Sequence, residues 1–139
     1  MFDSVSAGEI AVQGIRAQRV RMNIIANNIA NAQSTRTPEG GPFRRQLVTF
    51  RGEQLGVSIG EDKFGVSVKS VEADPSPFRT VFDPTHPDAN ADGIVSYPNI
   101  NLPTEMIDLL SAQRAYEANV DVLLQGRRMT QKSLEIIQA

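Results

Sequence analysis

The chain of 139 residues contains no cysteine and no tryptophan, and only 6% of its residues are aromatic. The absence of cysteine excludes disulfides, thiolate metal sites, iron–sulfur clusters and cysteine nucleophiles. No apolar run approaches the roughly 20 residues of a membrane span, and the N-terminal segment contains no secretory signal of about 7–15 apolar residues. We therefore expect a soluble chain that does not insert into membranes directly and does not use the general secretory route.

An excess of charge of either sign is also missing. The 14 Lys and Arg are balanced by 16 Asp and Glu, which gives a net charge of −2, and this argues against a nucleic-acid partner. Seven Arg lie between Arg16 and Arg51. They could face an anionic partner, or they could occupy an exposed helix face and strand edge, where positive charge deters edge pairing. We favour the second interpretation, because no aromatic platform is interleaved with them.

Proline and glycine are scarce at both ends of the chain. All eight Pro and seven of the ten Gly lie between Pro38 and Pro103. Because these residues interrupt helices, the sequence predicts an α+β fold with a helical segment at residues 1–33, a β-rich middle at 34–98 and a helical segment at 99–139. The expected strands, all in the middle, are Leu47–Phe50, Val57–Ile59, Phe64–Val71, Arg79–Phe82 and Ile94–Tyr97.

The C-terminal segment predicts a long helix from about 103 to 138. Counting from Leu102 in alternating steps of four and three residues selects positions that share one helix face, and most of them are apolar. Such a seam is typical of coiled coils. The seam comprises Leu102, Met106, Leu109, Gln113, Tyr116, Val120, Leu123, Arg127, Thr130, Leu134 and Ile137. Asn101 is the expected N-cap. A helix of about 54 Å is too long to bury this seam within a small globule, so it needs a partner helix.

The N-terminal segment offers that partner, with a weaker seam from about residue 4 to 31. The seam comprises Val5, Gly8, Val12, Ile15, Arg19, Met22, Ala26 and Ile29. Alone this helix would be marginal in water. The two seams together predict that the helices form an antiparallel coiled coil. The β-rich middle is then an insertion between the two helices.

Two features of the middle segment leave other functions open. Residues 88–93 match the first half of an EF-hand calcium loop, but position twelve of that loop is Asn99 and not the required Glu. His86 could be a base or a metal ligand, but no second His or Cys can join it. We interpret the loop as a structural turn and the histidine as solvated, and we expect no metal, no cofactor and no catalytic residue. A soluble calcium- or ligand-binding module stays the less favoured alternative.

Asparagine is unusually frequent near both helices. Asn23, Asn27, Asn28 and Asn31 crowd one stretch, and Asn119 recurs in the other helix, although Asn is mildly unfavourable inside helices. These residues could mark fraying toward a helix cap. Alternatively, their amides could hydrogen-bond between packed helices and fix their register.

Both ends of the chain carry motifs that resemble those of bacterial flagellar axial proteins, the rod, hook and hook-associated proteins. The N-terminal motif is Arg21-Met-Asn-Ile-Ile-Ala-Asn-Asn-Ile-Ala-Asn31. The C-terminal motif comprises Tyr97-Pro-Asn-Ile-Asn101, Glu105-Met-Ile-Asp-Leu109 and Ala112-Gln-Arg-Ala-Tyr-Glu-Ala-Asn119. The middle, with Phe43-Arg-Arg45 and the loop of residues 83–93, is similar to that of proximal rod proteins. The resemblance therefore covers essentially the whole chain.

The resemblance implies a structural subunit and not an enzyme. It implies export through the flagellar type III apparatus without a cleavable signal peptide, and assembly in the periplasm as part of the proximal rod of the basal body. The implied partners are other copies of the chain, other rod subunits, the basal-body ring and adaptor proteins and the export apparatus. Another proximal rod component is the alternative within this class. The subunit-interface residues that we predict are Asn23, Asn28, Ile29, Asn31, Asn101, Met106, Leu109, Arg114, Tyr116, Asn119 and Leu123.

Overall fold

The computed structural model describes residues 6–58 and 61–138. Helix α1 spans Ala7–Ala30, and its N-terminus is closed by a capping box. The Ser6 hydroxyl accepts from the Glu9 N–H at 3.3 Å, and the Ser6 N–H donates to the Glu9 carboxylate at 2.7 Å. Asn31 is the C-cap. The predicted helix is confirmed within one residue at its C-terminal end, and its predicted first residues lie outside the described residues.

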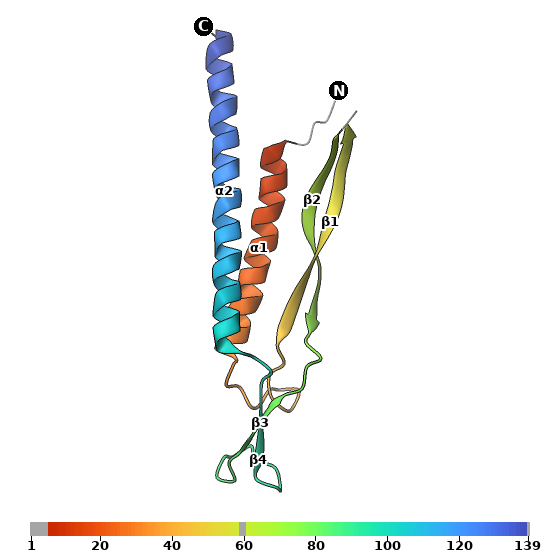
Figure 1. The fold of residues 1–139 in the computed structure, drawn as a ribbon, viewed down its shortest axis with the longest axis vertical. Coiled ribbons are helices and arrows are strands. Elements are labelled where there is room, and N and C mark those ends of the chain that lie inside the picture. Colours follow the sequence, from red (N-terminus) through yellow and green to blue (C-terminus); the bar gives the residue numbers. More distant parts are fainter. Residues whose placement is uncertain (1–5, 59–60, 139) are drawn as a thin grey trace.

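Helix α2 spans Leu102–Gln138 and is confirmed at nearly its predicted bounds. Its first turn is capped by Asn101, whose side-chain oxygen accepts from the Thr104 N–H at 3.2 Å. The two helices lie side by side and run in opposite directions, and α2 extends well beyond the start of α1 (Figure 1). No helix among the described residues combines the length and hydrophobicity that a membrane crossing needs.

The middle of the chain forms a long antiparallel hairpin and, separately, a very short one. Strand β1 (Gln46–Ser58) is continuous, although the sequence predicted two strands with a break between them. It pairs with β2 (Glu61–Ala73), with register shifts between Thr49 and Phe50 and between Gln54 and Gly56. The predicted break between the two strands was wrong, because pairing with β2 keeps the backbone extended through Gly52 and Gly56. The end of the predicted strand at Ile59 lies outside the described residues.

Strands β3 (Arg79–Phe82) and β4 (Ile94–Tyr97) match their predicted bounds and pair antiparallel. They lie at the opposite end of the elongated molecule from the C-terminus of α2 (Figure 1). Among the described strands, the four belong to two separate two-stranded sheets. Each two-stranded ribbon is too narrow to enclose apolar side chains by itself.

Helix α1 packs against both α2 and the β1–β2 hairpin. Against the hairpin, Gln13 sits over Gly65, where a Cβ would lie 1.8 Å from its side-chain oxygen. Against α2, Gly14 receives the Asn119 amide, and a Cβ at Gly14 would lie 2.7 Å from the amide oxygen. A Cβ at either glycine would therefore displace the side chain that packs on it, Gln13 at Gly65 or Asn119 at Gly14.

The packed faces of the helices are only partly those predicted. In α2 the positions Leu102, Leu109, Tyr116 and Leu123 are half-buried, as the seam required. Val120 is also half-buried, but the seam was wrong at Met106 and Gln113: Met106 is 56% exposed and Gln113 is exposed, whereas the residues that precede them, Glu105 and Ala112, are buried at 1% and 0% exposed. In α1 the buried residues are Ala11, Gly14, Ala17, Ile25 and Asn28, and none of them belongs to the predicted seam. Small residues occupy the contact because they let the two helix backbones approach closely.

Candidate functional site

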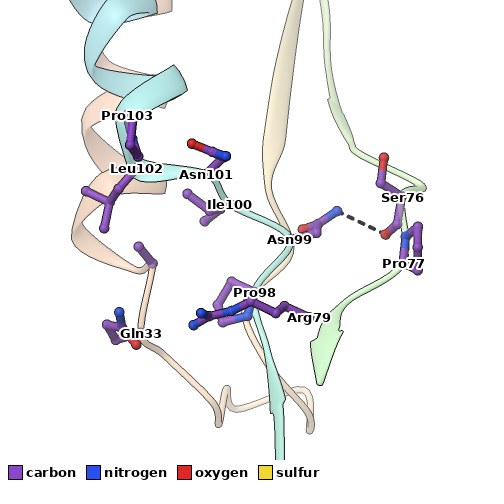
Figure 2. Close-up of a pocket in the computed structure, with 11 residues that line it drawn as sticks. Gln33, Ser76, Pro77, Arg79, Pro98, Asn99, Ile100, Asn101, Leu102 and Pro103 are labelled. Carbon is purple, nitrogen blue, oxygen red and sulfur yellow. Dashed lines mark hydrogen bonds between the residues drawn. The ribbon is translucent and has the colours of Figure 1, made fainter. Parts of the chain in front are cut away.

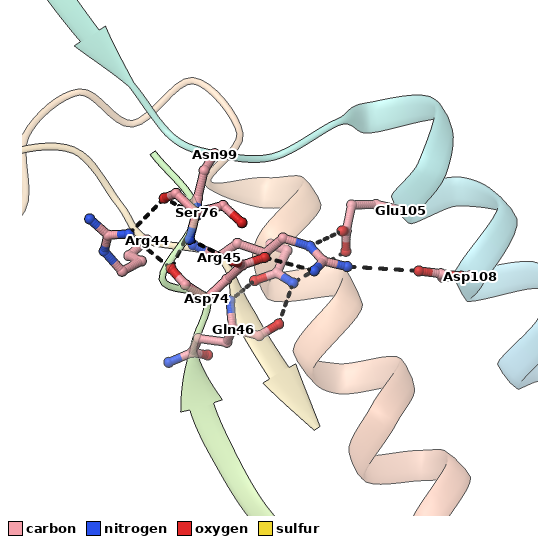
Figure 3. Close-up of polar contacts among 9 residues, drawn as sticks. Arg44, Arg45, Gln46, Asp74, Ser76, Asn99, Glu105 and Asp108 are labelled. Carbon is pink, nitrogen blue, oxygen red and sulfur yellow. Dashed lines mark hydrogen bonds and ion pairs between the residues drawn. The ribbon is translucent and has the colours of Figure 1, made fainter. Parts of the chain in front are cut away.

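The densest set of polar contacts joins the two helices to the root of the β1–β2 hairpin. We call Asn28, Arg45, Asp74, Asn99 and Glu105 the junction cluster (Figure 3). These residues come from α1, the two ends of the hairpin, the segment before α2 and the first turn of α2. The cluster therefore holds five separate stretches of the chain in one arrangement.

Asn28 is 1% exposed and uses its whole side-chain amide within the chain. Its oxygen accepts from the Gln46 N–H at 2.9 Å, and its NH2 group donates to the Gln46 carbonyl at 2.9 Å and to the Glu105 carboxylate at 3.2 Å. The hydrogen bonds to Gln46 resemble the pairing of one more strand with β1. For Asn28, the interpretation that asparagine amides bridge packed helices is confirmed.

Arg45 forms the charged centre of the junction cluster. Its Nε donates to Glu105 Oε1 at 2.5 Å, and its Nη1 donates to Asp74 Oδ2 at 3.1 Å. Its Nη2 also lies 3.8 Å from Asp108 Oδ2. Burial alone would lower the pKa of Arg45, but hydrogen bonds and charge attraction from Glu105 and Asp74 outweigh it and raise the pKa. The guanidinium thus neutralises a carboxylate that is 1% exposed, which would otherwise be costly to bury.

Asp74 connects the end of β2 to this centre. Hydrogen bonds from the Ser76 side chain and backbone, followed by the interaction with Arg45, lower the pKa of Asp74. Backbone bonds complete the junction: the Asp74 N–H donates to the Arg45 carbonyl at 2.8 Å, and the Arg45 N–H donates to the Asn99 side chain at 2.9 Å. The hairpin root is therefore held by backbone and charged groups together.

The interpretation of the arginines as exposed charges was wrong for Arg44 and Arg45, and Arg21 is also half-buried. The Arg45 side chain is 20% exposed and half-buried in the junction cluster. Arg44 lies with its guanidinium carbon 4.1 Å from the centre of the Phe78 ring and donates to the Asp74 and Ser76 carbonyls. The sequence alone did not identify this role, because Arg45 and its acidic partners are separated by some 30 to 60 residues. For Arg45 and Glu105, their position inside the middle and C-terminal motifs was the available signal.

The other asparagines that we predicted as interface residues have different surroundings. Asn31 acts as a cap: its side chain donates to the Asn27 carbonyl at 2.9 Å and accepts from the Ser34 hydroxyl at 3.1 Å. Asn119 donates to the Ala115 carbonyl of its own helix at 2.8 Å while packing on Gly14. Asn23 is exposed on α1. The structure thus brings Asn28 to Glu105 and Asn119 to α1, and it leaves Asn23 open to solvent.

The apolar interface candidates divide into two groups. Ile29, Leu109, Tyr116 and Leu123 are half-buried, and Leu123 lies 3.5 Å from a Cβ built at Gly8. Met106 and Arg114 are exposed. Met106 belongs to a larger set of solvent-facing apolar residues, which we call the outer surface of α2. This set comprises Met106, Ile107, Leu110, Val122, Leu124, Met129, Leu134, Ile136 and Ile137, with exposed fractions from 43% to 79%. A monomer with so many exposed apolar side chains on one helix is suited to packing against another protein.

An open pocket of about 660 Å³ lies where the helical part of the molecule meets the β3–β4 end (Figure 2). Its lining residues come from the segment just after α1, from the segment after β2 with the first residue of β3, and from residues 98–103. Asn99 Nδ2 donates across one side of it to the Ser76 carbonyl at 3.1 Å. Among these lining residues Arg79 is the one ionisable group. A pocket of this composition lacks the acid–base pair that hydrolytic or proton-transfer chemistry requires.

The calcium-like loop is a turn between β3 and β4 that is stabilised by its own side chains. Asn90 Oδ1 accepts from the Asp92 and Ile94 N–H groups at 3.0 and 2.9 Å. The Asp88 carboxylate accepts from the Thr35 hydroxyl and pairs with Arg36, and the Thr35 hydrogen bond in particular lowers the pKa of Asp88. In the described part of the chain, no three His, Asp or Glu side chains gather as metal ligands would. Asp88 therefore serves the contact of this loop with residues 35–36, and Asn90 serves its conformation.

Comparison with known proteins places the chain in one family. Residues 9–36 match the family described as flagella basal body rod protein, and residues 91–136 match the C-terminal family of the flagellar basal body rod FlgEFG proteins. The flagellar basal-body rod protein FlgC of Borreliella burgdorferi is 41% identical over 99% of this chain and 98% of its own length. FlgC of Bacillus subtilis is 39% identical over 91% of this chain and 93% of its own length, and that of Salmonella typhimurium is 38% identical over 94% and 95%. The chain therefore belongs to the FlgC family of flagellar basal-body rod proteins.

Proposed function

We propose that the chain is a structural subunit of the proximal rod of the bacterial flagellar basal body. In this proposal it polymerises helically through its terminal helices and transmits torque. The observation that carries the proposal is the outer surface of α2, where large apolar side chains face solvent along a helix of 37 residues. Removing one such side chain from water contributes about 1.5–3 kcal/mol, so several together can exceed the entropy cost of association.

The antiparallel pair of α1 and α2 would form the coiled-coil, inner-tube part of the subunit. Small residues on their shared face leave the large apolar residues of α2 for neighbours. The hairpin and the β3–β4 end would then face outward, at an orientation set by the junction cluster. Rigid transmission of torque needs close packing of this kind, because densely packed interiors transmit strain with little compression.

The partners that we infer are other copies of the chain, other rod subunits, and the ring and adaptor proteins of the basal body. Delivery would occur through the flagellar export apparatus without a cleavable signal peptide, and assembly would occur in the periplasm. The role is mechanical, and no catalytic residue is assigned. Contacts that repeat in one direction without closing into a ring would generate a helical assembly.

Substitution of Tyr116 tests the proposal. Tyr116→Asp places a charge on the half-buried face of α2, and we expect it to block rod assembly and swimming when it replaces the wild-type chain in a strain that lacks it. Export should persist, because α2 is not required to be folded during export; the variant should be recovered from the periplasmic fraction. Tyr116→Phe, which keeps an aromatic ring and adds no charge at the same half-buried position, is the matched control and should swim normally.

Normal swimming of the Tyr116→Asp strain would contradict the proposed role of the helices. Circular dichroism of both purified variants separates loss of assembly from loss of folding. Complementation distinguishes this role from that of another proximal rod component. The wild-type chain should restore swimming to a strain that lacks its own FlgC, and it should not restore swimming to strains that lack other proximal rod subunits.

A further inference from the structure

The open pocket of Figure 2 offers hydrogen-bond donors and contains no acidic side chain. Its lining residue Arg79 has no ion pair in the described part of the chain, and its guanidinium carbon lies 4.9 Å from the centre of the Tyr97 ring. The Arg79 side chain reaches past Pro98 toward Gln33 (Figure 2). The side-chain NH2 groups of Gln33 and Asn101 bond to no described residue, since Asn101 uses only its oxygen as the cap of α2. A cation and two amides are therefore available to an acceptor from outside the chain.

The walls around these donors are largely apolar. They include three prolines and two aliphatic residues, at positions 77, 98, 100, 102 and 103. A charge of one sign between apolar walls concentrates the electric field in the pocket, which favours a ligand of the opposite charge. The acceptor that fits both the donors and the walls is a carboxylate carried on a short apolar segment.

Residues 34–43, which we call the glycine loop, carry such a carboxylate. The loop doubles back on itself, because the Thr37 N–H donates to the Gly41 carbonyl at 2.9 Å. Its tip is residues 38–42, where Glu39 lies between two prolines and two glycines. Glu39 is exposed and has no hydrogen bond or ion pair to any described residue. The chain thus contains both an acid and a cation that are unpaired in the single copy.

The tip of the glycine loop projects from a base that is held in place. Gly40 and Gly41 have φ of 86° and 76°, which other residues rarely adopt, and a Cβ built on either would meet no atom within 4 Å. At the base, the Asp88 carboxylate accepts from the Thr35 hydroxyl at 2.8 Å and pairs with Arg36. A loop that is already ordered loses little conformational entropy when its tip binds.

We propose that the glycine loop of one copy inserts its tip into this pocket of a copy beside it. Glu39 accepts from Arg79 and from the two free amides, and the flanking prolines contact the apolar walls. Loop and pocket lie at one level of the elongated molecule, where the helices meet the β3–β4 end, so the contact joins copies side by side (Figure 1). Because the two surfaces differ, the contact is heterologous and can repeat from copy to copy. The inference rests on the proposed function, since it needs a subunit that polymerises.

Disulfide cross-linking in isolated basal bodies tests this contact. The wild-type chain has no cysteine, so a heterodimer of two tagged chains requires the introduced thiols. A strain that lacks its own FlgC expresses one chain with Pro38→Cys and another with Pro77→Cys, at exposed positions that leave Glu39 and Arg79 in place. The matched control replaces Pro77→Cys by Thr80→Cys, which is exposed on the opposite face of β3 from Arg79. We expect about tenfold more heterodimer with Pro77→Cys, because insertion raises the effective concentration of one thiol near the other.

Charge reversal provides a second readout. Adding Glu39→Arg to the Pro38→Cys chain should lower the yield of heterodimer by about fivefold, the effect of one exposed charge pair. Adding Arg79→Glu to the Pro77→Cys chain should then restore the yield. Asp92→Arg in place of Glu39→Arg reverses another exposed acid and should leave the yield unchanged.

Equal yields with Pro77→Cys and Thr80→Cys, no heterodimer in either case, or a yield that Glu39→Arg does not lower would overturn the contact between two copies. If the cysteine chains do not enter basal bodies, swimming of cysteine-free chains decides: Glu39→Arg should reduce it and the double variant with Arg79→Glu should recover it, and equal swimming of the two would overturn the contact. The wild-type chain tests the proposed function separately. If it restores swimming while the contact fails, the rod function stands; if it does not restore swimming, the rod function itself is wrong.

Discussion

Replacing Asn28 by alanine should destabilise the folded chain at its junction cluster. The amide makes two hydrogen bonds to the Gln46 backbone and one to the charged Glu105. Net contributions are about 1 kcal/mol for each neutral bond and about 1.5–3 kcal/mol for a bond to a charged group. Because a water molecule can enter and satisfy part of the vacated site, we expect a loss of about 3 kcal/mol in the free energy of unfolding.

Urea denaturation followed by far-ultraviolet circular dichroism measures this loss. With a slope of about 1.5 kcal/mol/M, the midpoint should fall by roughly 2 M. Asn23→Ala is the matched control, since Asn23 is exposed on the same helix, and it should change stability by less than about 0.7 kcal/mol through helix propensity alone. The reasoning would be refuted if Asn28→Ala cost less than about 1 kcal/mol, or if both variants lost the same amount.

Three further outcomes concern packing, charge and pH. Gly14→Ala should lose about 1–3 kcal/mol, because its Cβ would lie 2.7 Å from the Asn119 amide, whereas Gly126→Ala, with no neighbour within 4 Å, should gain about 0.5–1 kcal/mol; chemical denaturation of both variants checks this opposite sign. Arg45→Met should lose about 3 kcal/mol, because a glutamate that is 1% exposed would be left without its guanidinium; an unchanged thermal midpoint would contradict this. The pKa of Asp74 is lowered in the folded chain, so its contribution to stability is present above its unfolded pKa, near 4, and is lost as the pH falls through the folded pKa. Asp74→Asn should therefore lose less stability on acidification than the wild-type chain. Identical stability curves between pH 7 and acid pH for the two chains would refute the assignment.

The secondary structure was largely predictable because its signals are local. α1 lacks Pro and α2 has Pro only at 103 in its first turn, and the serine and asparagine caps mark their starts. Strands β3 and β4 were predicted at their observed bounds, since turn residues flank both of them. The continuity of β1 was missed, because Gly52 and Gly56 weaken the strand signal and their extension depends on pairing with β2.

The packed faces of the helices were less predictable. Apolar periodicity reports which side chains are hydrophobic, and it does not report how much space lies between two packed helices. The seam through Met106 selected a large apolar residue that faces solvent, while Glu105 and Ala112 face α1. In α1, Gly14 and Ala17 make the contact instead of the larger neighbours. Sequence patterns assume that a chain buries its own large apolar residues. A helix that contacts a neighbouring subunit keeps some of them exposed in the single chain, so the predicted packed face differs from the observed one.

The sequence by itself determined where the helices and most strands lie, and its terminal motifs determined the family, because both depend on residues close together in the chain. Only the tertiary structure decided that Arg45, Asp74, Asn28 and Glu105 form one junction, since charges separated by tens of residues can pair in many ways until the backbone is placed. It also decided which face of α2 is covered. That choice follows from how closely two backbones can approach, and it leaves large apolar residues of α2 such as Met106 and Ile107 on the outside.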